Sequence, residues 1–235
     1  MGTDVSEPAT QQSSPDRLIA QLHQAATAVA AASVVLLWLF ALATYRSTGA
    51  VLPGASAAMP VSIVAHGSAL AGFLVLSVAT AAGAYTAGSQ SRVTARLVWQ
   101  YLHRASSACG VALVIVHSAT MVVNSQGRIG PIVFIPFASG FDHLLLPLGV
   151  LAFDAIAIVT VIGIMRTQIS KVDRAVRLWR PVHLLAYVAW ILATAHFWCA
   201  IDNAPWWSIA TLLVGGAFVL AGGISRIVTL TGAKA

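Results

Sequence analysis

The sequence predicts an all-α membrane protein, a bundle of six transmembrane helices. Hydrophobic residues make up 58% of the chain and charged residues only 9%, and the mean hydropathy is +0.85. A water-soluble protein this apolar would aggregate, so the composition indicates that lipid is its solvent. Six windows of about 20 apolar residues are each long enough to cross a bilayer. They are Ala25–Thr44, Val61–Thr86, Leu97–Val123, Leu144–Met165, Pro181–Ala200 and Pro205–Ile224.

These windows divide the chain into three parts. Residues 1–16 are polar, contain Ser and Pro and lack periodicity, and the first apolar run begins only after residue 24, so we expect residues 1–24 to be a disordered cytoplasmic N-terminus. The first apolar run begins too late for a cleaved signal peptide, and it contains no ionisable residue, which suggests a peripheral helix facing lipid. Residues 25–225 form the six-helix domain, and residues 226–235 form a short cytoplasmic tail.

The distribution of Lys and Arg predicts the orientation. With the N-terminus inside, eleven basic residues fall on the inner side and only two, Arg46 and Arg128, on the outer side. Both termini are then cytoplasmic, in a protein of the cell membrane, and the third and fifth spans both run outward. The net charge of +6 comes from loops between spans, so topology explains it better than nucleic-acid binding does.

Two spans each carry a pair of histidines at nearly equal spacing. His103 and His117 lie on the third span, and His183 and His196 on the fifth; at 1.5 Å per residue the members of a pair are about 21 Å and about 20 Å apart. One metal ion cannot bridge that distance, but two cofactors, one near each membrane surface, can use it. Because the two spans are parallel, His103 should pair with His183 at the inner level and His117 with His196 at the outer level.

Imidazole is the neutral ligand that haem iron accepts on both axial faces, so the four histidines are predicted to hold two b-type haems. Ionisable side chains in hydrocarbon are costly, which argues against four incidental core histidines. One geometric difficulty follows from the spacing: 14 steps of 100° return to within about 40° of the same helix face, whereas 13 steps end about 140° away. We therefore expect the fifth span to bend, to contain a π-bulge, or to approach its haems from different sides.

The sequence resembles the ferric reductase-like transmembrane domain, shared by NADPH oxidases, ferric reductases and the haem-bearing membrane subunit of bacterial methionine-sulfoxide reductase systems. The resemblance covers roughly residues 60–225. It is carried by LHRASSACGVALVIVH (Leu102–His117), by Phe134–Arg166 and by WRPVHLLAYVAWILATAHFW (Trp179–Trp198). It implies a six-helix bundle in which His103 and His183 hold the inner haem and His117 and His196 the outer one, and through which electrons cross the membrane.

The chain departs from the oxidases and iron reductases of that family at its C-terminus. Those proteins continue into a flavin and nicotinamide domain, whereas this sequence stops at Ala235 and contains no Gly-rich dinucleotide fingerprint. The expected role is that of the membrane haem subunit of an oxidoreductase. It would take electrons from a separate cytoplasmic flavoprotein or from membrane quinol and pass them to an unidentified acceptor at the outer face.

Several further residues are candidates with competing explanations. Arg104 and Arg180 lie beside the inner ligands and could bind haem propionates, or they could simply mark the inner side. Trp190 falls midway between His183 and His196; it could lie between the haems, although a lipid-facing position is favoured. Cys109 and Cys199 are predicted to lie about 15 Å apart in depth, too far for a disulfide.

Asp154, in the middle of the fourth span, could take up a proton during turnover or face a polar cavity. His66 and His143 fall toward the outer surface and could shape a substrate or quinone site, with an ordinary interfacial position favoured for His143. The competing function is a haem-free transporter or proton channel, in which His66, His117, Asp154 and His196 form a relay. A third possibility is a haem-binding scaffold without electron flow.

Overall fold

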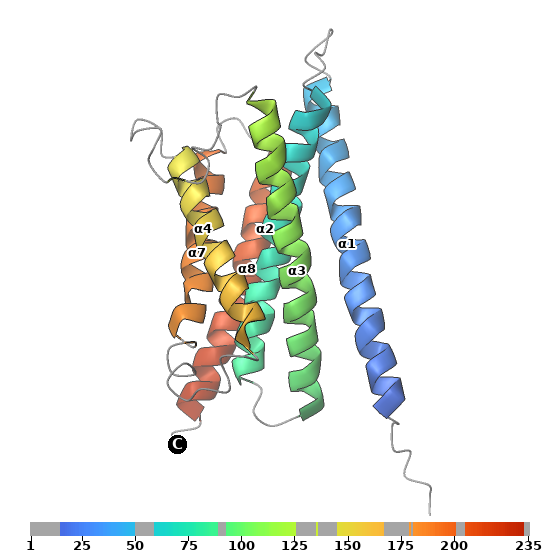
Figure 1. Ribbon diagram of the computed structural model, residues 1–235, viewed down its shortest axis with the longest axis vertical. Coiled ribbons are helices and arrows are strands. Elements are labelled where there is room, and N and C mark those ends of the chain that lie inside the picture. The colour runs from blue at the N-terminus through green and yellow to red at the C-terminus, as the bar shows by residue number, and fades with distance from the viewer. Residues whose placement is uncertain are drawn as a thin grey trace, which may run out of the picture.

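The computed structural model describes residues 15–49, 59–88, 93–125, 135, 145–166, 179, 181–200 and 205–232. Within these residues the fold is all-helical and contains six helices long and apolar enough to cross a membrane, as predicted (Figure 1). They are α1 (Pro15–Gly49), α2 (Met59–Gly88), α3 (Val93–Asn124), α4 (Leu145–Ile164), α7 (Leu185–Cys199) and α8 (Trp206–Gly232).

Two of the predicted boundaries are wrong. Helix α1 begins at Pro15, so residues 15–24 are helical rather than disordered, and residues 1–14 lie outside the described part. Helix α8 continues to Gly232, well past the predicted end of the last span at Ile224. A hydropathy window detects only the apolar stretch, whereas a helix continues into the polar interface until a residue stops it. Pro15 suits the first turn of a helix because its missing N–H has no partner there anyway.

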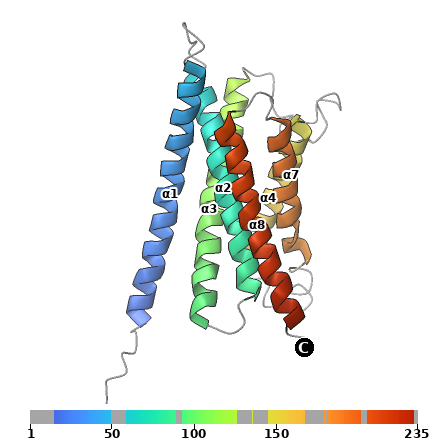
Figure 2. The same cartoon turned by 180° about the vertical axis from the view of Figure 1, so that it is seen from behind.

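Helix α2 is the centre of the bundle. It packs against α3, α8 and α1, and half of its apolar window is buried, far more than in any other described span. Figures 1 and 2 show α2 between α3 and α8 from both sides. The helix is rich in small residues that let neighbours approach closely: a Cβ on Gly222 of α8 would lie 2.9 Å from the Cα of Ala81. Small residues at contacts are the usual means of packing helices in lipid.

The remaining two helices form a second pair. Helices α4 and α7 pack on each other, at the side of the bundle opposite α1 (Figures 1 and 2). Helix α7 makes only a small contact with α2, and α3 and α7 have little or no close backbone contact. The two histidine-bearing helices are therefore held apart, by their separate packing on α2 and on α4.

The start of the fifth span is irregular. A short helical turn at residues 181–183 precedes α7, and a turn at Leu184 separates the two. The N–H of Leu184 donates to the carbonyl of Pro181 (3.1 Å) and that of Tyr187 to the carbonyl of Leu184 (3.0 Å). Such three-residue bonds raise the rotation per residue from about 100° to about 120°. The tightening reduces the 140° mismatch between His183 and His196. A three-residue turn was not among the three predicted solutions, and it tightens the helix where a π-bulge would widen it.

Candidate functional site

The structure brings the four histidines together as two pairs across the space between α3 and α7. The ring centres of His103 and His183 are 6.0 Å apart, and the ring planes are inclined by 83°. Those of His117 and His196 are 6.4 Å apart and inclined by 66°. In each pair one ring approaches the other edge-on rather than by stacking. The pairing is the one expected if α3 and α7 run in the same direction.

Three of these histidines have their Nδ1 atom fixed by a backbone carbonyl. His103 Nδ1 lies 2.8 Å from the oxygen of Ala79, and His117 Nδ1 lies 2.9 Å from the oxygen of Ala65. His196 Nδ1 lies 2.7 Å from the oxygen of Leu145. A carbonyl oxygen can only accept, so Nδ1 must carry the proton in all three rings. The lone pair is then on Nε2, which is the tautomer needed to bind a metal through Nε2.

The two acceptors on α2 have the same spacing as the two histidines on α3. Ala65 and Ala79 are separated by as many residues as His103 and His117, and the pairing order is reversed because the helices are antiparallel. One helix thus orients both ligands of its neighbour. The α4 carbonyl of Leu145 does the same for His196 on α7, so each histidine helix takes its acceptors from the helix that packs closely on it.

Glycines make room for two of these hydrogen bonds. Gly83 and Gly149 follow the accepting residues Ala79 and Leu145 by one helical turn. A Cβ on Gly149 would lie 2.7 Å from His196 Cε1, and one on Gly83 would lie 3.2 Å from His103 Nδ1. The absence of a side chain lets each imidazole lie against the backbone of the neighbouring helix. At the corresponding position after Ala65 the residue is Ala69, which is also small.

His183 is held differently. Its Nδ1 is buried and has no hydrogen-bond partner in the part of the chain that the structure describes. Its ring instead stacks on Trp179, with 5.0 Å between ring centres and 12° between planes. The guanidinium carbon of Arg166, just beyond the end of α4, lies 5.0 Å from the centre of the Trp179 ring. Trp179 is thus in direct contact with a paired histidine.

Trp190 lies inside the bundle, so the lipid-facing position favoured from the sequence is wrong. Its indole N–H donates to the hydroxyl of Ser77 (2.9 Å), a fully buried residue of α2. Its ring stacks on Phe73, with 6.0 Å between ring centres, and Phe73 in turn stacks on Phe197. A buried indole N–H needs an acceptor, and Ser77 supplies one in the middle of the membrane span. Sequence hydropathy does not show the inward position of Trp190, because that position depends on a serine of another helix.

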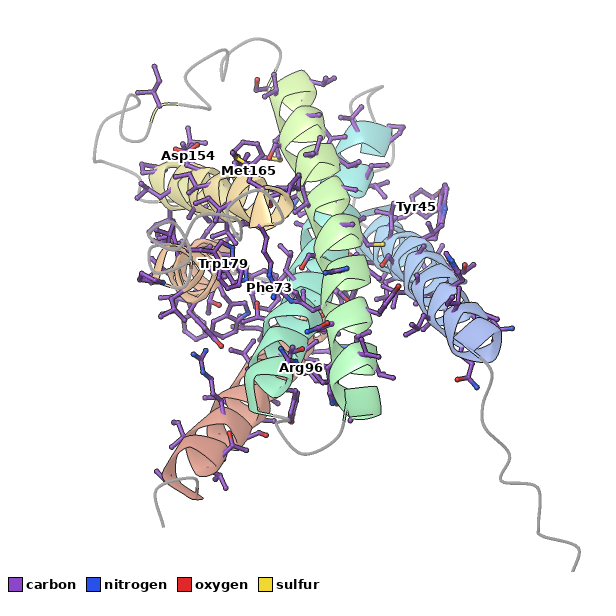
Figure 3. The ribbon with its side chains drawn as sticks, turned by 60° about the horizontal axis from the view of Figure 1, so that its bottom comes forward. Tyr45, Phe73, Arg96, Asp154, Met165 and Trp179 are labelled. Atoms are coloured by element: carbon purple, nitrogen blue, oxygen red, sulfur yellow. The ribbon has the colours of Figure 1, made fainter. Side chains whose placement is uncertain are left out.

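The other predicted site residues do not join the histidine pairs. Arg104 is exposed on α3, next to His103 in sequence. Asp154 is partly exposed on α4, on the side away from α7 (Figure 3). His66 is exposed, and its Nδ1 bonds within its own helix to the oxygen of Ser62 (2.8 Å). Arg180, His143 and Arg128 lie outside the described residues. Cys109 and Cys199 are free thiols, as predicted.

Sequence reasoning missed the residues that support the histidines. A backbone carbonyl leaves no signal in the sequence. The small residues that let the histidines approach do leave one, since they are small positions on the helices next to the histidine spans: Gly149, Gly83 and the other small residues of α2. Among the described residues no three His, Cys, Asp or Glu side chains gather as a metal site, so the histidines meet only in pairs.

No protein-family model matches the sequence. No curated protein matches it at a significant level.

Proposed function

We propose that this protein carries electrons across a membrane through two haems, one held by His103 and His183 and the other by His117 and His196. The observation that supports this most is the spacing of the paired rings. A metal–imidazole bond of about 2.0–2.1 Å, with the ring centre about 1.1 Å beyond the nitrogen, would put the centres of two imidazoles that share one metal about 6.2–6.4 Å apart. The observed distance of 6.4 Å between His117 and His196 falls in that range, and the 6.0 Å between His103 and His183 is slightly shorter.

The protonation of the rings supports the same assignment. In His103, His117 and His196 the Nδ1–H is committed to a carbonyl, so Nε2 is free to bind iron. A ring of porphyrin nitrogens supplies the other four ligands, so a site that offers only two imidazoles is complete for haem and incomplete for a zinc-type centre. The paired rings come from two helices that have little or no close backbone contact with each other, as they would on either side of a flat cofactor.

Haem when bound accepts and releases one electron at a time. The chain's contribution is to fix the ligands at two depths about 21 Å apart along α3. The backbone bonds keep the rings of His103, His117 and His196 in one orientation and one tautomer. The apolar surroundings keep water and other reactants away from the middle of the path.

The rival function, a haem-free proton relay through His66, His117, Asp154 and His196, has less support. A relay needs ring nitrogens that exchange protons with one another, but the Nδ1 protons of His117 and His196 are tied to backbone carbonyls. His66 bonds within its own helix, and Asp154 lies on the side of α4 away from α7.

The test is the visible spectrum of the purified protein together with a haem-to-protein ratio. We expect a Soret peak, sharp α and β bands on dithionite reduction, and two haems per chain. His117→Ala and His103→Ala should each lose one haem. His66→Ala is the matched control, because the Nδ1 of this α2 imidazole bonds to the Ser62 carbonyl of its own helix, and it should keep both haems. A ratio near one in the wild type, or no loss in the two ligand variants, would remove the two-haem assignment.

The direction of flow and the donor belong to the same proposal. The positive-inside distribution supports a His103–His183 level near the cytoplasm, where a flavoprotein or membrane quinol would deliver electrons. The basic segment Lys171–Arg180 would steer an acidic flavoprotein to that side. In inverted vesicles such a donor should lose on-rate with rising ionic strength and with Arg174→Glu plus Arg177→Glu. Reduction by quinol should respond to neither change, so indifference to both would exclude the docked flavoprotein.

A further inference from the structure

The four paired histidines are of two kinds. His103, His117 and His196 are oriented by a hydrogen bond from Nδ1 to a backbone carbonyl of a neighbouring helix. The Nδ1 of His183 is buried without a partner among the described residues, and this ring lies on the indole of Trp179 at an interplanar angle of 12°. The difference matters because the carbonyl bond both fixes the ring plane and raises the basicity of the ligating nitrogen.

Trp179 can fix the plane of the His183 ring, but it cannot raise the basicity of the ligating nitrogen. A stacked indole restricts the rotation of the imidazole about its Cβ–Cγ bond, since any turn of the ring breaks the face-to-face contact. It gives the Nδ1–H no acceptor. The indole itself is held by Arg166, whose cation lies 5.0 Å from the ring centre and is attracted by its π electrons. Arg166, Trp179 and His183 thus form one stack just before the N-terminal end of α7, beside the three-residue turn at Leu184.

We propose that Trp179 is the positioning residue for His183, that Arg166 fixes the indole, and that the His103–His183 site therefore has one ligand of weaker donor strength than the His117–His196 site. The inference rests on the proposed function, because donor strength has meaning only toward a bound metal. It goes beyond that function by assigning two residues, on either side of the segment between α4 and α7, to the tuning of one site only.

The experiment uses the full chain in the His117→Ala background, where only the His103–His183 site remains and its signal is unambiguous. Trp179→Leu removes the stacking face, Trp179→Phe keeps an aromatic face, and Arg166→Gln removes the cation but leaves the indole. Trp207→Leu is the matched control, since Trp207 contacts Phe40 rather than a histidine. The readouts are haem retention after dilution, the low-spin ferric signal in electron paramagnetic resonance, and the midpoint potential.

We expect Trp179→Leu to lose haem several-fold faster than its parent and to shift or broaden the ferric signal. Trp179→Phe should restore most of both, Arg166→Gln should give a smaller shift in the same direction, and Trp207→Leu should match the parent. In the chain with both sites, Trp179→Leu should leave the His117–His196 signal unchanged. Parental haem retention and spectrum in Trp179→Leu, or equal loss of both haems from the two-site chain, would overturn the positioning role. Absence of any low-spin haem before mutation would instead refute the proposed function.

Discussion

His196 on α7 places its Nδ1 2.7 Å from the carbonyl oxygen of Leu145 on α4, directly over the missing side chain of Gly149. The glycine is what permits the contact, because a Cβ there would come within 2.7 Å of His196 Cε1, closer than real carbon atoms approach. The orientation of a candidate ligand therefore depends on a residue that cannot itself bind anything.

Gly149→Ala should therefore displace His196 and lower haem content toward one per chain. The added methyl must push the imidazole away or separate α4 from α7, and overpacking of this kind costs about 1–3 kcal/mol. Gly163→Ala is the control on the same helix, since nothing lies within 4 Å of its added Cβ. That variant should keep two haems and gain slightly in stability from the higher helix propensity of Ala. Equal haem content in the two variants would show that the Gly149 contact is unimportant.

Gly83→Ala should act in the same way on His103, but less strongly. Its Cβ would lie 3.2 Å from His103 Nδ1, a distance that a shift of a few tenths of an ångström relieves. We expect two haems to remain at saturation and faster haem loss from one site on dilution, measured by transfer to an apoprotein acceptor. A larger effect than that of Gly149→Ala would contradict this ranking.

The inclination of the paired rings predicts two distinguishable ferric signals. The planes of His103 and His183 are nearly perpendicular at 83°, whereas those of His117 and His196 are inclined by 66°. Near-perpendicular axial imidazoles leave the iron d orbitals almost degenerate, which gives a strongly anisotropic low-spin spectrum. Electron paramagnetic resonance should therefore resolve two species, the more anisotropic of which disappears in His103→Ala. A single species at two haems per chain would argue against the two geometries.

The hydrogen bond from Trp190 to Ser77 should contribute measurably to stability. Double-mutant cycles for side-chain bonds in membrane proteins average about 0.6 kcal/mol and reach about 1.7. A cycle of Ser77→Ala and Trp190→Phe, followed as unfolding in mixed detergent micelles, should give a coupling energy in that range, because the Ser77 hydroxyl also donates to the Phe73 carbonyl and is fixed in place.

The control is a second double-mutant cycle that uses Ser33 of α1 in place of Ser77. The Ser33 hydroxyl donates within its own helix to the carbonyl of Val29. Coupling between Ser33→Ala and Trp190→Phe should be zero within error. If the two cycles gave the same coupling, the Trp190–Ser77 bond would not be its source.

Asp154→Asn should leave haem content at the wild-type value, because the carboxylate points away from α7 and no paired histidine contacts it. If the carboxylate takes up a proton during turnover, reoxidation of the reduced protein should slow without loss of haem, which stopped-flow absorbance at the α band measures. Parallel loss of haem and rate would instead give Asp154 a structural role.

The sequence predicts the membrane spans of this protein better than it predicts the surroundings of the histidines. The six spans follow from composition alone, since about 20 apolar residues in a row have few other stable environments than a bilayer. The ends of α1 and α8 did not follow, because helical hydrogen bonding continues where hydropathy falls. The two histidine levels were predictable because helix rise is constant, so spacing along the chain converts directly into depth.

What surrounds each histidine was decided by the tertiary structure. A backbone carbonyl is the same in every residue, so the packing of the helices decides which carbonyls accept from the histidines: those of Ala65, Ala79 and Leu145. Helix α2 takes the central position because its small residues admit three neighbouring helices. Trp190 turns inward because Ser77 on α2 offers an acceptor, and the contact of Trp179 with the ring of His183 is likewise a tertiary contact that hydropathy does not show. Depth in the membrane is a property of one helix and is encoded locally. Orientation of a ring needs a second helix, and only packing determines which one that is.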